Sequence, residues 1–234
     1  MIVTEISFRP YTYRMLRRIG DVNLPGGVDA GMELAVFIQT DEGVTGCSVG
    51  VDSAAQTIPN LADLIVGTDP RSVRSSWNRM TARAFKAGNH GPMSAGISAI
   101  DRALWDLRAK LHGVPLWKEF GGDGRPVRAY ASGLDSPLSD EELYKFYAGL
   151  AAKGVTAGKL KVGRNAVDDE RRIRVMIDAL SSKGGRPQLI IDANEYWSMK
   201  QAIQRIAQLE KNFDFLWVEE PIPRQNFEGL RRVS

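Results

Sequence analysis

The sequence has almost no cysteine and no long apolar run. These two absences exclude several classes of protein. Its 234 residues include a single cysteine, Cys47, so no disulfide framework and no metal site built on several thiolates is present. No stretch approaches the roughly 20 apolar residues of a membrane span, and the N-terminus alternates instead of forming an apolar signal segment. We therefore expect a soluble, cytoplasmic protein with no membrane partner.

The sequence also lacks a strong excess of charge of either sign. Its 31 lysine and arginine residues against 28 aspartate and glutamate residues leave a net charge of +3 at pH 7. The densest basic cluster, RMLRR at 14–18, is typical of a solvated loop, and no long basic run of the kind that nucleic-acid binders carry is present. We expect no nucleic-acid partner. Hydrophobic residues make up 43% of the chain, enough for a core in one large domain or two ordinary ones.

The first part of the chain has the pattern of an antiparallel sheet. Alternating residues at 2–10 and 33–40 predict two strands, and a turn leads from the second into a third strand at 44–50. Residues 13–31, which lie between the first two strands, contain glycine and proline and are too many for a tight hairpin. Loops of that length are usually functional or mobile, so we expect one or the other there.

A long helix is predicted after residue 90. Gly91 and Pro92 mark its start, because proline is favoured at the first helical position, and Gly113 is expected to cap its end in a left-handed conformation. His112 is expected to be a residue of that C-terminal cap. His90, in the loop before the helix, is a candidate for contact with a substrate.

After GGDGRP at 121–126 the pattern changes to strands that alternate with helices. The strands are expected at 127–133, 157–163, 188–194 and 215–221, and they begin roughly 26 to 32 residues apart, the length of one β-α unit. No G-x-G-x-x-G follows the first of them, which favours a (β/α) barrel over a dinucleotide-binding sheet. We expect an α/β protein with an α+β capping domain at 1–124 and about four β-α units of a partial TIM-like barrel at 125–234.

Two capping boxes support the helices of this second part. Ser139 with Glu142, and Ser198 with Gln201, each place a hydroxyl and a carboxyl or amide three residues apart at the expected start of a helix. A complete barrel needs about eight such units, and half of one would leave two open sheet edges. We therefore expect that the sequence is a fragment or that another chain completes the barrel.

Charged residues end three of the predicted parallel strands. Lys159 and Lys161 lie on one face of their strand because side chains alternate, as do Asp192 and Asn194 on the next, and Glu219 ends the last. Folds of this class place their chemistry at the carboxyl ends of the strands. We expect two lysines and two carboxylates to converge on one pocket. Plain salt bridges at the rim of the sheet are the alternative.

The order K-x-K, D-A-N and V-E-E-P, behind an antiparallel first domain, resembles the enolase superfamily in the mandelate racemase branch of the mandelate racemase/muconate lactonizing enzyme family. Residues 96–122 are also similar to the end of that family's capping domain, and the segment 13–31 matches its mobile cap segment. The third metal carboxylate and the acid/base of the opposite face would lie on later strands, which this sequence does not contain.

The resemblance implies a role for each of the five residues. Lys161 matches the base that abstracts the α-proton of a carboxylate substrate, and Lys159 matches the residue that helps to neutralise the substrate carboxylate. Asp192 and Glu219 match the first two ligands of Mg²⁺, and Asn194 matches a position beside the metal that can contact substrate. We also expect a small-molecule carboxylate as partner and a homo-oligomer.

Other conspicuous residues are expected to be structural. Glu220 is expected to lie beside the metal or to be structural instead of being a ligand, and Trp197 and Trp217 are typical of the core or the barrel rim. The acidic residues 168–170 are expected to oppose the dipole of a helix at its first turn and not to form a metal site.

The residue types suit proton abstraction next to a carboxylate. Removing that proton adds a second negative charge, which a divalent cation held by oxygen ligands offsets as the enolate forms. An ordinary lysine, with a pKa near 10.4, is protonated at pH 7 and cannot act as a base. Lys159, about 6–7 Å along the strand, disfavours a second positive charge on Lys161, and the metal acts in the same direction.

Three functions remain open on the sequence alone. The first is a lyase that dehydrates an acid sugar to a 2-keto-3-deoxy acid. The second is an isomerase that racemises or epimerises a hydroxy acid or an amino-acid derivative by the same half-reaction. The third is a family-like scaffold without catalytic activity. The length and stereochemistry of a substrate would be set by the cap loop and by the later strands.

Overall fold

The computed structural model describes residues 1–86, 88 and 90–234, and the chain forms two compact units. The first unit contains Met1–Arg14 and Ala30–Pro126, and the second contains Met15–Asp29 and Val127–Ser234. Each unit has its own cluster of buried apolar residues. Since Met15–Asp29 belongs to the second unit, a segment from near the N-terminus is part of the unit that contains the parallel sheet.

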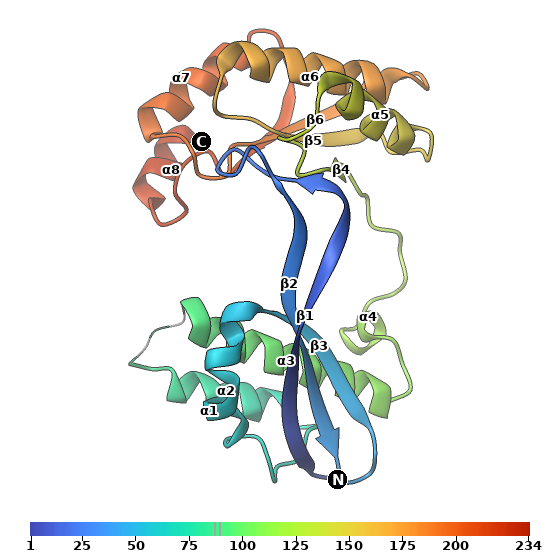
Figure 1. Cartoon of the computed structure of the whole chain (residues 1–234), viewed down its shortest axis with the longest axis vertical. Helices are drawn as coiled ribbons and strands as arrows, with labels where there is room; N and C mark the ends of the chain where they lie inside the picture. The colour runs from blue at the N-terminus through green and yellow to red at the C-terminus, as the bar shows by residue number, and fades with distance from the viewer. Residues whose placement is uncertain (87, 89) are drawn as a thin grey trace. The chain divides into compact units, whose positions relative to one another are not determined.

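The first unit is built on an antiparallel sheet (Figure 1). Strands β1 (Val3–Ile19), β2 (Val28–Thr40) and β3 (Thr45–Val51) are neighbours in that order, and β2 pairs with β3 from Glu33 opposite Val51 to Gln39 opposite Thr45. The helices of this part are η1 (Asp52–Gln56), α1 (Ile58–Ala62), α2 (Val73–Arg83), α3 (Gly91–Leu111) and α4 (Leu116–Glu119).

Strands β1 and β2 run further than predicted. Only residues 20–27 connect them, so the expectation of a loop across 13–31 is wrong. The second half of β1 is largely exposed, and a strand without a buried face shows no apolar alternation in its sequence. Polar cross-strand contacts extend the pairing instead, because the hydroxyls of Tyr11 and Tyr13 donate to Glu33 at 2.9 and 3.4 Å.

Helix α3 begins and ends as predicted. Pro92 lies in its first turn, His112 is its C-terminal cap residue, and Gly113 has a φ of 65°. Its apolar stripe is buried against the sheet, where Gly46 allows close contact because a Cβ there would lie 2.2 Å from the carbonyl oxygen of Ala103. Among the described residues, no helix is both long and apolar enough to cross a membrane.

The second unit carries the predicted parallel sheet. Strands β4 (Ala131–Ser132), β5 (Ala157–Lys161), β6 (Gln188–Asp192) and β7 (Phe215–Glu219) are neighbours in that order, all parallel. The helices between and after them are α5 (Asp140–Ala151), α6 (Ala166–Ser181), α7 (Met199–Leu209) and α8 (Phe227–Val233). β4 is shorter than the predicted 127–133, and Val127 is 91% exposed, so its β-branched side chain has no sheet to pack on.

Both predicted capping boxes are present. The Ser139 hydroxyl accepts from the backbone N–H of Glu142 while the Glu142 carboxylate accepts from the backbone N–H of Ser139. Ser198 and Gln201 make the same reciprocal pair at the start of α7. Each box satisfies two N–H groups at the start of its helix, that of the cap residue and that of the third helical residue, and so helps to define where α5 and α7 begin.

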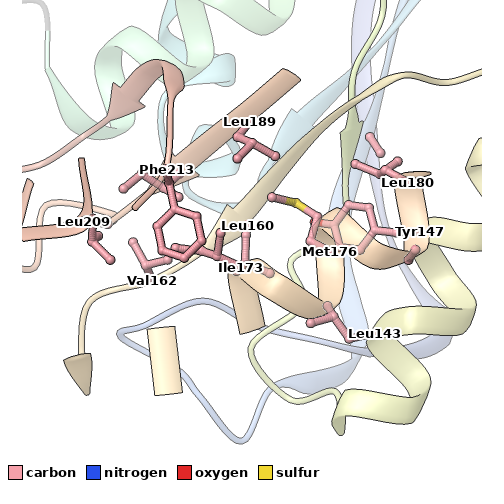
Figure 2. Packing of buried hydrophobic residues seen from close by; sticks show 14 of the residues in the cluster. Leu143, Tyr147, Leu160, Val162, Ile173, Met176, Leu180, Leu189, Leu209 and Phe213 are labelled. Carbon is pink, nitrogen blue, oxygen red and sulfur yellow. The ribbon is translucent and has the colours of Figure 1, made fainter. Parts of the chain in front are cut away.

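The two faces of the parallel sheet have different roles. Apolar side chains of one face, among them Leu160 of β5 and Leu189 of β6, pack with residues of α5, α6 and α7 (Figure 2). Lys159 and Lys161 alternate with Leu160 along β5 and therefore point to the other face. The packed face supports the sheet, and the charged side chains project from the face that the helices do not cover.

Candidate active site

The charged residues at the strand ends are aligned by the register of the parallel sheet. Lys161 of β5 is paired with Asp192 of β6, and Asp192 is paired with Glu219 of β7. Lys159 lies two residues before Lys161, on the same face of β5. The pairing therefore places three charged side chains side by side at the carboxyl edge of the sheet, with a fourth next to them.

These four side chains form a connected set of ion pairs. The Lys161 Nζ lies 2.5 Å from Asp192 Oδ2, and the Lys159 Nζ lies 3.2 Å from the same oxygen. Lys159 Nζ also lies 2.5 Å from Glu219 Oε1. The side chains of Lys161 and Asp192 are only 5% and 2% exposed, whereas that of Glu219 is 31% exposed. The predicted convergence of two lysines and two carboxylates is what the structure shows, and each charge has an opposite partner.

Lys159 is the cation that links the two carboxylates. Burial by itself would lower the pKa of Lys159, but its hydrogen bonds with Glu219 and Asp192 outweigh that effect and raise the pKa above its ordinary value. The contacts with the two carboxylates therefore favour the positively charged form of Lys159. That property suits a residue that neutralises a carboxylate and does not suit a base.

The backbone after β6 and β7 is strained. Four non-glycine residues in the described part of the chain have a positive φ, and three of them follow these strands: Asn194 at 45°, Glu195 at 63° and Glu220 at 43°. The two turns are held together by the N–H of Glu195, which donates to the carbonyl of Glu220 at 2.7 Å. Strained backbone of this kind is concentrated at functional sites.

Asn194 is placed beside Asp192 by this turn. Its backbone N–H donates to Asp192 Oδ1 at 2.9 Å, and its side-chain nitrogen donates to Glu220 Oε2 at 3.2 Å. Its side-chain oxygen Oδ1 is buried and has no hydrogen-bond partner among the described residues. A buried oxygen without a donor is costly, so this atom is available for a ligand that supplies a proton or a positive charge.

The two carboxylates fit a divalent cation. Asp192 Oδ2 and Glu219 Oε1 both contact the single charge on Lys159 Nζ, which shows that oxygens of both residues reach one cationic centre. Carboxylate oxygens are the ligands that Mg²⁺ prefers. Within the part of the chain that the structure describes, no group of three or more His, Cys, Asp or Glu side chains could hold a metal. The residues present therefore offer two of the three carboxylates that the resemblance implies.

Two aromatic residues that the sequence did not single out as site residues border Lys159. The Lys159 Nζ lies 5.7 Å from the centroid of the Tyr130 ring, and Tyr130 packs edge to face on Trp217 at 5.5 Å. The indole N–H of Trp217 donates to Glu219 Oε2 at 3.2 Å. Trp217 is two residues before Glu219, so the spacing along β7 could have identified it. Tyr130 precedes the short β4, and no pattern in the sequence marks it.

Residues 20–27, which connect β1 and β2 and belong to the second unit, lie near this site. The Arg164 Nε donates to the carbonyl of Val22 at 2.8 Å, and the Asn23 side chain donates to the carbonyl of Asn194 at 2.9 Å. Val22 also lines a cavity of about 290 Å³ with Lys161, Gly163 and other residues of the β4–α5 and β5–α6 connections. A ligand near Lys161 would therefore meet this connecting segment.

His90 lies in the other unit. It is exposed, precedes α3, and lines a surface groove of the first unit with Val51, Ser94 and Arg102. The other five candidate residues belong to the second unit. Contact of His90 with a substrate stays a prediction.

Trp197 and Asp169 have structural roles close to the site. Trp197 is 3% exposed and its indole N–H donates to the carbonyl of Gly163 at 2.9 Å. Asp169 is buried, accepts from the backbone N–H of Gly163, and pairs with Arg205 at 2.8 Å. Asp169 therefore does more than oppose the helix dipole, because together with Trp197 it fixes the connection that follows Lys161.

Replacing Asp169 by asparagine is expected to make the stability of the protein depend less on pH. Burial raises the pKa of the Asp169 carboxyl above the ordinary value of about 3.9, although the Gly163 N–H and Arg205 act against it. The folded state then binds this proton more tightly than the unfolded state does. Its contribution to the free energy of unfolding therefore falls as pH rises from the unfolded pKa through the folded one.

Urea unfolding of the wild type and Asp169→Asn from about pH 3 to 7 checks this expectation. The advantage of the wild type over the variant should shrink as the pH rises. The exposed Asp178→Asn variant is the control, and its difference from the wild type should not change in this way. An advantage of the wild type over Asp169→Asn that grows with pH would contradict the assignment.

Two family models match the chain. The model described as mandelate racemase / muconate lactonizing enzyme, N-terminal domain, matches residues 28–121. The model described as enolase C-terminal domain-like matches residues 143–234. The first range includes strands β2 and β3 of the antiparallel sheet, and the second includes Lys159, Lys161, Asp192 and Glu219.

Two similar proteins have names that describe reactions of sugar acids. The 3,6-anhydro-alpha-L-galactonate cycloisomerase of Streptomyces coelicolor is 33% identical over 208 residues, which cover 86% of this chain and 56% of that protein. The L-talarate/galactarate dehydratase of Salmonella typhimurium is 34% identical over 178 residues, covering 74% of this chain and 43% of that protein. The chain thus spans about half the length of these relatives.

A solved structure has the same fold. The crystal structure of a racemase from Streptomyces coelicolor A3(2) with bound magnesium superposes with a TM-score of 0.89 at 30% identity, covering 99% of this chain and 66% of that one. The predicted α/β fold class, an antiparallel capping sheet with a parallel β-α part of a TIM-like barrel, is confirmed.

Proposed function

This chain belongs to the enolase superfamily, in the mandelate racemase/muconate lactonizing enzyme family, and from that premise we propose that it carries a half-site for Mg²⁺-dependent abstraction of the proton α to a carboxylate. The observation that carries the proposal is the alignment of Lys161, Asp192 and Glu219 across three parallel strands, with Lys159 bonded to both carboxylates. At this edge of the sheet, the lysines can supply a base, and the two carboxylates can supply a negatively charged site for a cation.

Each residue has one task in the proposed reaction. Lys161, in its neutral form, accepts the α-proton at Nζ, while Lys159 stays charged and holds the substrate carboxylate through its ammonium hydrogens. Asp192 and Glu219 would hold Mg²⁺, which when bound offsets the negative charge that grows on the substrate carboxylate as the enolate forms. Asn194 borders this position, and its unpartnered side-chain oxygen can accept a hydrogen bond from a substrate hydroxyl.

Dehydration of an acid sugar to a 2-keto-3-deoxy acid is the reaction we favour. Two relatives above 30% identity carry the names of sugar-acid substrates, and one of them is called a dehydratase. Loss of the β-hydroxyl after α-proton abstraction is the step that would make this chain's chemistry a lyase reaction. The substrate partner would be a small polyhydroxy carboxylate.

Racemisation or epimerisation is the second candidate. The solved structure described as a racemase shares 30% of the sequence and the fold. The same half-reaction at Lys161 followed by return of a proton to the opposite face would give an isomerase. The third possibility, a scaffold without turnover, is the outcome if neither reaction occurs.

An NMR assay in deuterated solvent separates these functions. The full-length protein with Mg²⁺ is incubated with a set of aldonic and aldaric acids, and the α-proton signal of each is followed. Loss of that signal together with a 2-keto-3-deoxy product indicates a dehydratase. Loss of the signal with the β-hydroxyl retained and a new diastereomer indicates an epimerase. The proposed function would be contradicted if no acid lost its α-proton signal and if the spectra were the same with and without a chelator of Mg²⁺.

Three further expectations stay predictions. They are the cytoplasmic setting, the homo-oligomer and the absence of a nucleic-acid partner. Size-exclusion chromatography with light scattering tests the second of them directly.

A further inference from the structure

We propose that Asp135 and Tyr147 are positioning residues that hold the strand carrying Lys159 and Lys161 in its reactive place. The inference rests on the proposed function of these lysines. Neither Asp135 nor Tyr147 touches the expected substrate position, and neither is required by the metal site. Both are completely buried, with 0% of their surface exposed.

The short length of β4 leaves Lys161 of β5 without a β4 residue opposite it. β4 pairs with β5 only through Ala131 opposite Gly158 and Ser132 opposite Lys159, so the pairing stops before Lys161. The Lys161 backbone N–H instead donates to Asp135 Oδ1 at 3.3 Å. A side chain thus replaces the missing strand at the residue that carries the base.

Tyr147 holds the backbone of the other lysine, Lys159, by a hydrogen bond to its carbonyl oxygen. Its hydroxyl lies 2.6 Å from the carbonyl oxygen of Lys159 and 3.1 Å from Asp135 Oδ2. The shorter contact takes the hydroxyl hydrogen, because a phenol has only one to donate. Tyr147 reaches this place from α5, where its ring packs in the core of the second unit (Figure 2). The backbones of both lysines are therefore held by side chains that touch each other.

A charged partner secures Asp135. Arg172 Nη2 lies 3.1 Å from Asp135 Oδ1, and the same guanidinium donates to the carbonyls of Asp135 and Leu138 at 2.8 Å. A buried carboxylate is costly unless it is paired and hydrogen-bonded, and here both conditions are met. Removing the Asp135 carboxylate would leave the Arg172 charge without its anionic partner and the Lys161 N–H without its acceptor.

The backbone before Asp135 is bent to bring it inward. Leu134 has a φ of 47°, a left-handed conformation that a leucine rarely adopts. Gly20, of the segment between β1 and β2, clamps this bend from the other side: its N–H donates to the carbonyl of Leu134 at 2.9 Å and its carbonyl accepts from Ser136 at 3.2 Å. Asp135 is thus fixed on both sides, by the connecting segment and by β5.

The two contacts lead to different kinetic effects. Asp135 accepts a hydrogen bond from the backbone of Lys161, the proposed base. Loss of the Asp135 carboxylate should therefore slow the proton-transfer step and lower kcat. Tyr147 is bonded to the backbone of the carboxylate-holding lysine, so its loss should act first on binding and raise KM. A misplacement of about 1 Å at a reacting group costs on the order of 100-fold in rate.

Three variants of the full-length protein test the inference with Mg²⁺ and the substrate found by the exchange assay. Asp135→Ala is expected to lower kcat by about 10- to 100-fold. Asp135→Asn keeps an oxygen acceptor for the Lys161 N–H and is expected to recover most of that loss. Tyr147→Phe is expected to raise KM by about 3- to 10-fold, since one neutral hydrogen bond is lost. Tyr144→Phe, on the exposed side of the same helix, is the matched control and should leave both constants unchanged.

Amide hydrogen exchange measured by NMR gives a second readout that does not need turnover. The Lys161 amide should lose protection in Asp135→Ala and keep it in Asp135→Asn. Equal kcat and KM for all variants, or unchanged Lys161 protection in Asp135→Ala, would overturn the inference. An equal loss of activity in Asp135→Ala and Asp135→Asn, in proportion to a lower folded fraction, would also overturn it, because that pattern indicates stability alone. If the wild type exchanges no substrate proton but Lys161 protection follows Asp135 as expected, the proposed function fails and the anchoring of the lysine strand stands.

Discussion

Lys161→Ala is expected to lower the rate of α-proton exchange by about 10²- to 10⁴-fold, the usual contribution of a general base. The Lys161 Nζ is the atom next to Asp192 at the edge of the sheet, and its side chain is 5% exposed, so water cannot easily replace it. The variant should still fold, because Asp192 keeps its contact with Lys159 at 3.2 Å. Exchange of the substrate α-proton with deuterated solvent, followed by NMR, measures the effect.

The other lysine and an exposed lysine provide the comparison. Lys159→Ala should affect both KM and kcat, because Lys159 is expected to hold the substrate carboxylate in the ground state and in the transition state. Lys145→Ala, which removes an exposed pair with Glu141 on α5, should leave exchange unchanged. If Lys161→Ala exchanges the proton as fast as the wild type does, the base is a different residue.

Asp192→Asn is expected to weaken Mg²⁺ binding by at least about 10- to 100-fold, since groups that only support metal ligands already have effects of that size. Asp192 is 1% exposed and its Oδ2 contacts both lysines, so its negative charge lies at the centre of the set of ion pairs. Asparagine keeps the shape of the side chain and one oxygen but removes the negative charge. Calorimetric titration of the full-length protein with Mg²⁺ measures the change.

The same substitution also disturbs the ion pairs, and the controls must separate the two effects. Breaking a buried pair typically costs about 3–5 kcal/mol of stability, so circular dichroism should confirm that Asp192→Asn is folded at the temperature of the titration. Asp178→Asn, at an exposed position of α6, is the control for a simple loss of negative charge. Equal Mg²⁺ affinity of wild type and folded Asp192→Asn would remove Asp192 from the proposed metal site.

Local signals made the parallel sheet and its charged edge predictable. Each strand from β5 to β7 is a short apolar run that ends in charge, and strand ends of a parallel sheet must meet at one edge. The capping boxes at Ser139 and Ser198 were readable because each depends on residues only three apart. The sequence alone therefore predicts that Lys159, Lys161, Asp192 and Glu219 lie close together.

Features that depend on distant residues were not predictable in the same way. Asp135 lies in a connection, 26 residues before Lys161 along the chain, and only the fold brings its carboxylate to that backbone. Tyr130 lies just before the short strand β4, and the residues before it are exposed, so no apolar pattern in the sequence marks its position. The length of β1 was missed because its second half has no buried face, so its sequence lacks the alternation by which strands are recognised.

The contact of Lys159 with both carboxylates has a consequence for ion selectivity. Its ammonium already supplies one full positive charge to Asp192 and Glu219 at 3.2 and 2.5 Å. A potassium or sodium ion that displaced it would bring no additional charge and would lose the hydrogen bonds. A divalent ion brings one charge more, so its attraction to the two carboxylates is stronger than that of a monovalent ion at the same distance. The tethered ammonium therefore leaves a monovalent cation no gain in charge at this pair of carboxylates.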